Sequence, residues 1–211
     1  MIIFDLDGTL LNTLEDLVNS TNYALAKFNF PLKTTEEVRF AVGSGVEKLL
    51  ECVVPEGKNN KDFYNCLAIF KDYYSQHNCD KTQPYQGIFE LLHRLKQANI
   101  KIAVVSNKYD LAVNDLCFKY FEGLYDIAVG EHYDCQKKPC PDSVFKILDK
   151  FNLLKTEVIF VGDSEVDVET AKNARVKSIS VLWGYRDKDC LMNSGAIDFI
   201  NEPLQLLDYL N

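Results

Sequence analysis

Six short apolar runs, separated by helical patterns, constrain the fold of this chain more than any other feature of its sequence. The runs are rich in β-branched residues, which is typical of strands that are buried on both faces. Strands of this kind that alternate with helices form a parallel sheet. We therefore expect an α/β fold, with a Rossmann-like parallel sheet core and helices on both faces. The expected strands are residues 2–5, 101–106, 125–129, 157–162, 178–182 and 197–200.

Residues 13–82 interrupt this alternation, because they carry helical patterns and no convincing strand. Thr34 and Glu37 stand at the spacing of a capping box, which predicts the start of a helix there. The sequence therefore predicts an α/β core domain of residues 1–12 and 83–211, and an inserted all-helical domain of residues 13–82. The helices expected in the insert are residues 14–28, 36–42, 44–52 and 61–77.

The charge of the 211-residue chain narrows the classes of partner. Its formal net charge is −8 and its longest basic run is Lys137-Lys138, which argues against nucleic acid or an anionic membrane as the main partner. A small soluble substrate fits better. No apolar stretch has the length of a signal peptide or a membrane span. The seven cysteines show no C-x-x-C spacing, which favours reduced thiols. We expect a cytoplasmic protein that is a monomer or a homodimer.

Four aspartates follow two of the expected strands. Asp5 ends the first strand and Asp7 lies two residues further along. Asp163 follows the strand 157–162, and Asp167 lies one helical turn beyond it. The carboxyl ends of parallel strands line one crevice, so the four carboxylates should converge there. Such a cluster is strongly unfavourable without a counter-charge. It therefore implies a hard cation with oxygen ligands, and Mg²⁺ is the commonest one that also bridges to phosphate.

Other residues near expected strand ends suit a phosphoryl group. Ser106 and Asn107 stand where a strand is expected to turn into a helix, so a hydroxyl and backbone N–H groups would face the same crevice. Lys138 precedes Pro139 in a stiff segment, and its charge could neutralise both phosphate and carboxylate. Gly8 lets the backbone approach a ligand closely. These features predict a site for a small phosphorylated molecule.

Several of these assignments have alternatives that the sequence leaves open. Ser106 is also a favoured residue for a helix cap. Lys137 is an alternative to Lys138 as the functional lysine. The stretch that holds Gly43 and Gly45 fits a turn between two helices as well as a loop that faces a substrate.

Four stretches of the chain, "DLDGT", "VVSN", "KKPCPD" and "GDSEVD", resemble in their order and spacing the motifs of haloacid dehalogenase-like hydrolases. Within that superfamily, "VGSGVEKLL", "PYQGIFELLHRLK", "AVVSNK" and "VLWGY" resemble the phosphoglycolate phosphatase-like branch. In that branch a helical cap is inserted after the first motif. The resemblance therefore covers the core and implies that residues 13–82 are a cap domain.

The resemblance implies a phosphatase that uses Mg²⁺ and hydrolyses small organic phosphate monoesters through an aspartyl-phosphate, with 2-phosphoglycolate as the favoured substrate. Asp5 would be the nucleophile. Asp7 would protonate the leaving alcohol and later deprotonate water. Ser106, Asn107 and Lys138 would stabilise the transferred phosphoryl charge. The metal would be held by Asp5, the backbone carbonyl of Asp7, and Asp163, with Asp167 in support; Gly8 and Thr9, and Gly43 and Gly45 of the cap, would contact the substrate.

Two other functions remain open at this stage. One is a phosphoryl mutase of the β-phosphoglucomutase type, which would keep the same core and differ in the cap. The other is a non-catalytic phosphate or metal sensor. Asp7 argues against a sensor, because a protein that only accepts phosphate has no need of a proton donor two residues from the nucleophile.

One position departs from the family pattern. The family usually has glycine after a stretch like "AKNA", whereas this chain has Arg175. We expect Arg175 to occupy a left-handed position at the end of a helix, which a non-glycine residue tolerates poorly. The departure bears on local stability and not on the chemistry.

Overall fold

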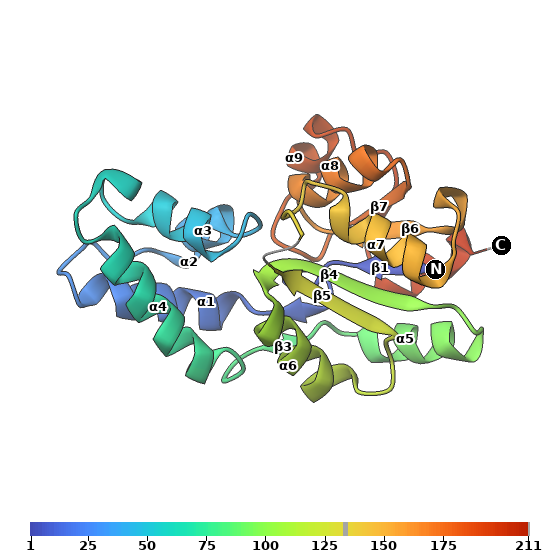
Figure 1. Ribbon diagram of the computed structural model, residues 1–211, viewed down its shortest axis with the longest axis horizontal. Coiled ribbons are helices and arrows are strands. Elements are labelled where there is room, and N and C mark those ends of the chain that lie inside the picture. Colours follow the sequence, from blue (N-terminus) through green and yellow to red (C-terminus); the bar gives the residue numbers. More distant parts are fainter. Residues whose placement is uncertain (133–134, 211) are drawn as a thin grey trace. The chain divides into compact units, whose positions relative to one another are not determined.

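The structure is a computed structural model that describes residues 1–132 and 135–210. The chain divides into two compact units (Figure 1). One unit, the α/β core, comprises Met1–Leu11 and Pro84–Asn211, and the other, the helical unit, comprises Asn12–Gln83. The helical unit therefore spans residues 12–83, which extends the insert expected from the sequence, residues 13–82, by one residue at each end.

The α/β core is built on a six-stranded sheet in the order β5-β4-β1-β6-β7-β8. Every neighbouring pair in this sheet is parallel, which confirms the expected fold class. The central strand β1 is almost fully buried along its length, as a strand covered on both faces must be. The strands are β1 (Ile2–Phe4), β4 (Ile102–Tyr109), β5 (Ile127–Glu131), β6 (Ile159–Gly162), β7 (Lys177–Val181) and β8 (Phe199–Ile200).

Helices cover both faces of the sheet, with α7 and α8 on one side and α5 and α6 on the other (Figure 1). On the first side, Val144 and Ile147 of α7 and Ala171 of α8 pack with Ile3 and Phe160 of the sheet in one apolar cluster. The helical elements of the core are α5 (Ile88–Gln97), α6 (Asp110–Phe121), α7 (Asp142–Phe151), α8 (Glu165–Ala174), α9 (Lys188–Asn193) and the 3₁₀ turns η2 (Lys155–Glu157) and η3 (Pro203–Tyr209).

Strand β4 differs from its expected form, because it continues to Tyr109 instead of ending at Ser106. Its register against β5 shifts between Val105 and Tyr109. An irregularity of this kind keeps the backbone extended while it redirects the side chains, and such features are frequent next to active sites. The passage from strand to helix therefore lies at Tyr109–Asp110, and not at Ser106–Asn107 as the sequence indicated.

The helical unit holds four α-helices around its own apolar core, in which Phe63, Cys66 and Phe70 are fully buried. The predicted capping box is present: the Glu37 N–H donates to Thr34 Oγ1 at 3.3 Å, and the Thr34 N–H donates to Glu37 Oε2 at 2.8 Å. The helices are α1 (Leu14–Ala26), α2 (Thr35–Ala41), α3 (Val46–Val53) and α4 (Phe63–His77), with the 3₁₀ turn η1 (Gly57–Asn59).

A buried carboxylate joins the first and the last segment of the helical unit. Asp16 of α1 accepts hydrogen bonds from the N–H groups of Lys81 and Thr82 and from the Thr82 hydroxyl, at 2.8 to 3.1 Å. The short strands β2 (Leu11–Asn12) and β3 (Gln83–Pro84) pair at the two places where the chain passes from one unit to the other. Among the described helices, none combines the length and the hydropathy that crossing a bilayer requires.

Candidate active site

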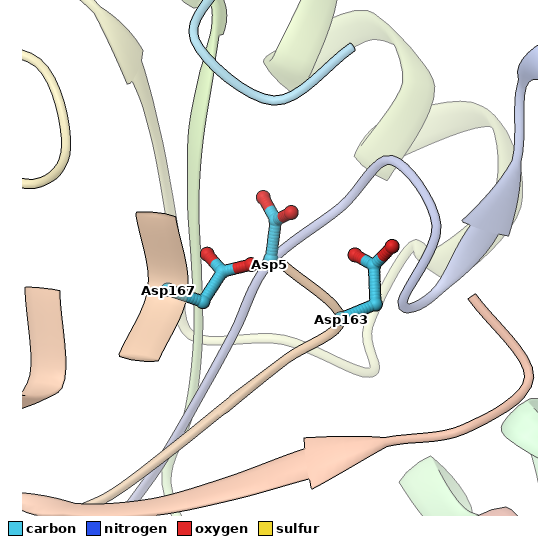
Figure 2. A group of neighbouring side chains, drawn as sticks. All are labelled: Asp5, Asp163 and Asp167. Carbon is cyan, nitrogen blue, oxygen red and sulfur yellow. The ribbon is translucent and has the colours of Figure 1, made fainter. Parts of the chain in front are cut away.

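Three carboxylates meet at the carboxyl end of the sheet in the α/β core. Asp5 follows β1, Asp163 follows the neighbouring strand β6, and Asp167 lies in the first turn of α8. Figure 2 shows Asp167 directed toward Asp5, with the carboxylate of Asp163 beside them. Each of the three offers an oxygen atom within 4.8 Å of the others, and all three residues are buried. The structure thus brings together three of the four acids that the sequence singled out.

Asp163 is oriented by the chain segments around it. Its Oδ2 accepts a hydrogen bond of 2.7 Å from the Tyr185 N–H, and its Oδ1 accepts one of 3.0 Å from the Thr9 hydroxyl. Gly8, with φ +87°, and Gly184 pass so close that a Cβ on either would collide with the Asp163 side chain. Both positions therefore require glycine. The sequence predicted Thr9 as a substrate contact, and the structure shows that its hydroxyl orients Asp163.

Asp167 caps its own helix and pairs with a lysine. Its Oδ2 accepts hydrogen bonds from the Ser164 N–H at 3.1 Å and from the Ser164 hydroxyl at 2.6 Å. Its Oδ1 lies 2.6 Å from Lys138 Nζ. The cap orients the carboxylate before any ligand binds. Ser164 was missed in the sequence, although its place between Asp163 and the first turn of a helix is a capping signal.

Lys138 lies between two of the acids. Its Nζ is 2.7 Å from Asp5 Oδ1 and 2.6 Å from Asp167 Oδ1, and its side chain is 3% exposed. Lys137, the alternative left open by the sequence, pairs with Glu131 at 2.7 Å and is 35% exposed. The structure therefore brings Lys138, and not Lys137, to the cluster of acids.

Burial and mutual repulsion act on the acids in this cluster. Burial raises the pKa of the Asp5 carboxyl well above its usual range, and the nearby Asp167 and Asp163 add to the effect, while Lys138 opposes it. The pKa of Asp163 is raised to about 7, again first by burial and then by Asp167, against the hydrogen bonds from Tyr185 and Thr9. Burial alone would lower the pKa of Lys138, but Asp167 and Asp5 outweigh it and raise the value.

Asp7 forms a second, partly buried ion pair, with a residue that the sequence did not single out. Lys108 Nζ lies 2.7 Å from Oδ1 and 2.9 Å from Oδ2 of Asp7. The side chains are 4% exposed for Lys108 and 13% exposed for Asp7. The signal available in the sequence was the position of Lys108 directly after Ser106 and Asn107. The predicted end of the strand at Ser106 placed Lys108 on a helix and hid its connection to the site.

Ser106 and Asn107 are buried near the same lysines. Ser106 Oγ accepts a hydrogen bond from the Lys108 N–H at 3.3 Å, and Asn107 Nδ2 donates to the Lys138 backbone oxygen at 2.9 Å. The Asn107 side chain thus holds the segment that carries Lys138. Gly43 and Gly45 belong to the helical unit, between α2 and α3, so their predicted contact with a substrate stays a prediction.

The charges of the site suit a divalent cation. Four carboxylates, those of Asp5, Asp7, Asp163 and Asp167, have two buried lysine partners in Lys108 and Lys138. When all four are ionised, two negative charges are left over. Oxygen donors from three aspartates within 4.8 Å of one another are the ligands that Mg²⁺ prefers, so the donor set fits a hard divalent cation.

The chain is similar to known proteins over nearly its whole length. A family model described as haloacid dehalogenase-like hydrolase matches residues 2–181. A phosphoglycolate phosphatase of Aquifex aeolicus is 31% identical over 213 residues, which cover 100% of this chain and 96% of the relative. A phosphoglycolate phosphatase of Vibrio vulnificus is 32% identical over 217 residues, which cover 99% of this chain and 94% of the relative.

Solved structures show the same architecture over nearly the whole chain. A protein of Lactobacillus delbrueckii subsp. bulgaricus superposes with a TM-score of 0.94 at 32% identity, covering 99% of this chain and 97% of the other. A predicted phosphoglycolate phosphatase from Haemophilus somnus superposes with a TM-score of 0.93 at 27% identity, covering 100% and 97% of the two chains.

Proposed function

The chain belongs to the haloacid dehalogenase-like hydrolase family, and we propose that it is a Mg²⁺-dependent phosphatase that hydrolyses small phosphate monoesters through an aspartyl-phosphate. One observation carries the proposal: a buried aspartate, Asp5, lies at the end of the central strand, paired with Lys138 and close to two further acids. A nucleophile of this kind needs nearby positive charge, because its attack brings it against an anionic phosphoryl group.

The reaction would proceed in two displacements. Asp5 attacks phosphorus, the bond to the ester oxygen breaks, and Asp7 gives its proton to the leaving alcohol. Water then attacks the aspartyl-phosphate, Asp7 takes a proton from that water, and Asp5 is regenerated as phosphate leaves. Lys138, 2.7 Å from Asp5, would balance the charge of the phosphoryl group while it is transferred, together with Ser106.

The metal is part of the same proposal. Asp5, Asp163 and the backbone carbonyl of Asp7 would hold Mg²⁺, and Asp167 would support them from its capped position. The ion would supply positive charge for the phosphoryl oxygens. The excess of carboxylates over lysines and the raised pKa values of Asp5 and Asp163 support this assignment, because a cation in this place would relieve the repulsion between the acids.

Among phosphate monoesters we propose 2-phosphoglycolate as the favoured substrate, since the curated relatives named above are phosphoglycolate phosphatases. A small phosphorylated metabolite, and not nucleic acid or a membrane, would be the partner of a chain with a net charge of −8. The seven cysteines are free thiols, which suits the reducing cytoplasm that we propose as its compartment.

The test is phosphate release from a panel of small phosphate esters and one anhydride, pyrophosphate, measured with Mg²⁺ and again with a chelator. The panel contains 2-phosphoglycolate, nucleoside monophosphates, sugar phosphates and pyrophosphate. We expect hydrolysis that requires Mg²⁺ and favours 2-phosphoglycolate. Absence of release from every ester by folded protein would contradict the proposal and favour a mutase or a sensor instead. Activity that persists in the chelator would contradict the metal assignment alone.

A further inference from the structure

We propose that Lys108 selects substrates whose leaving group carries a carboxylate next to the ester oxygen, by forming an ion pair with that carboxylate. The inference rests on the proposed function and adds to it a residue that determines specificity. It assigns different parts of the substrate to the two buried lysines: Lys138 to the phosphoryl group and Lys108 to the leaving group.

The first step concerns the place of Lys108 relative to the reaction. Asp7 must come within hydrogen-bond reach of the leaving oxygen, because it transfers a proton to that atom. Lys108 Nζ contacts both oxygens of the same carboxylate, at 2.7 and 2.9 Å. The ammonium group would therefore lie no more than about two hydrogen-bond lengths, ~6 Å, from the leaving oxygen. A carboxylate attached to the carbon that bears this oxygen falls within this distance.

The second step concerns charge. The site presents the clustered carboxyl groups of Asp5, Asp163 and Asp167, whose negative charge would repel a leaving group that is itself an anion. Lys138 lies between Asp5 and Asp167, so its charge acts on the side of the nucleophile. Lys108 places positive charge beside Asp7, where the leaving group is expected. It is the lysine whose position allows an anionic leaving group to approach these acids.

The third step concerns burial and rigidity. The Lys108 side chain is 4% exposed, so an ion pair formed there is screened far less by water than a pair at the surface. Its backbone N–H donates to Ser106 Oγ at 3.3 Å, and the next turn is tied to β5 by a 2.8 Å hydrogen bond from the Gly130 N–H to Asp110 Oδ1. These bonds fix the backbone around Lys108, and the ion pair with Asp7 orients its ammonium group before a substrate binds, which favours discrimination between substrates.

The experiment compares 2-phosphoglycolate with its amide, 2-phosphoglycolamide, which has nearly the same shape and lacks the carboxylate charge. The quantity measured is the ratio of the two kcat/KM values. A change that affects Asp7 or the transferred phosphoryl group alters both substrates together and leaves this ratio unchanged. The variants are Lys108→Met, Lys108→Gln and Lys108→Arg, and thermal unfolding checks the fold of each.

We expect the wild-type protein to prefer the carboxylate substrate, and Lys108→Met and Lys108→Gln to lower the ratio about 10- to 100-fold, as expected for loss of a charge-assisted hydrogen bond. Lys108→Arg should keep more of the preference than either. Lys138→Met is the matched control: it should lower hydrolysis of both substrates and leave the ratio within about threefold of the wild-type value.

A ratio that stays at the wild-type value in Lys108→Met or Lys108→Gln would overturn the inference, because Lys108 would then act only by positioning Asp7. If neither Lys108→Met nor Lys108→Gln folds, the ratio of the two kcat/KM values in the wild-type protein is the test. An active wild-type enzyme that does not prefer the carboxylate substrate overturns the inference and leaves the proposed function standing. A wild-type protein that is inactive on every ester overturns both.

Discussion

Asp163 shows how single residues in this site combine opposing requirements. It is buried beside Asp167, which disfavours its charged form, yet the Tyr185 N–H and the Thr9 hydroxyl stabilise that form. The balance leaves its pKa raised to about 7. A carboxyl with such a pKa changes its charge near neutral pH, so the affinity of the site for a cation should depend on pH in that range.

The first prediction concerns Mg²⁺ and pH. A folded-state pKa raised above the ordinary value of 3.8 means that this group favours the folded state below about pH 4, and that this contribution is lost as pH rises through about 7. Mg²⁺ needs the deprotonated form. We therefore expect the rise in unfolding temperature produced by a fixed Mg²⁺ concentration to be larger at pH 8 than at pH 6.

Thermal unfolding with and without Mg²⁺ over this range measures the effect. Asp163→Asn is the control, because it should lose most of the Mg²⁺-induced rise at both pH values. A rise that is the same at pH 6 and pH 8 in the wild-type protein would show that Asp163 does not control cation binding.

The second prediction concerns the nucleophile. Asp5→Asn replaces the nucleophilic carboxylate by a neutral amide and should lower phosphate release by about 10³-fold or more. The charged form of Asp5 is already disfavoured by burial and by Asp167, so the metal-free variant should unfold at a temperature no lower than that of the wild-type protein. Phosphate release and thermal unfolding test the two parts. Retained turnover would mean that another residue is the nucleophile.

At the scale of elements, the ends of strands and helices determine what the site contains. The register shift in β4 carries the extended backbone past Ser106 to Lys108, which then pairs with Asp7. The C-terminal end of α8 has an unfavourable backbone conformation. Arg175 has φ +59° there, which confirms the left-handed position that the sequence indicated. A side chain in this conformation costs free energy that glycine avoids.

The third prediction follows from that helix end. Arg175→Gly should raise the free energy of unfolding by about 1 kcal/mol, because glycine adopts the left-handed conformation without steric cost. Asn152, at the end of α7 with φ +52°, gives a matched control. Asparagine tolerates this conformation better than arginine, so Asn152→Gly should raise stability less. Denaturant unfolding measures both variants. A gain for Asn152→Gly equal to or above that for Arg175→Gly would contradict this explanation.

The whole molecule consists of two units whose chain connections lie close together in the structure, at β2 and β3. The helical unit takes the position in the sequence of the cap that the family resemblance implies. A cap over an active site excludes water and large substrates. The part of the chain that discriminates by size would then be separate from the part that carries the acids.

The fourth prediction belongs to this scale. If the helical unit covers the site, a phosphoserine in a folded phosphoprotein should be hydrolysed at least about 100-fold less efficiently than a small ester, because it cannot enter beneath the cap. The measurement compares kcat/KM for the phosphoprotein with that for free phosphoserine, which carries the same ester without the protein. Comparable values for the two would rule out a size-excluding cap.

Local sequence patterns were sufficient to predict much of the fold and the acidic residues of the candidate site. Alternating apolar runs and helical periodicity predicted the parallel sheet, and the capping box at Thr34 followed from a short-range rule. The left-handed position of Arg175 was expected from the family pattern. The acids at strand ends were found because parallel strands place their carboxyl ends at one edge. Each of these signals depends on residues that are close in sequence, so the amino-acid order alone contains it.

Only the tertiary structure decided which charged groups pair. Lys108 and Asp7 are 101 positions apart, and Thr9 and Asp163 are 154 apart. Their contacts depend on β4 and β6 lying on either side of β1, and on a register shift that no local pattern indicated. The sequence by itself determined which residues carry the candidate chemistry. The order of the strands determined their partners, because it alone brings distant segments within hydrogen-bond distance.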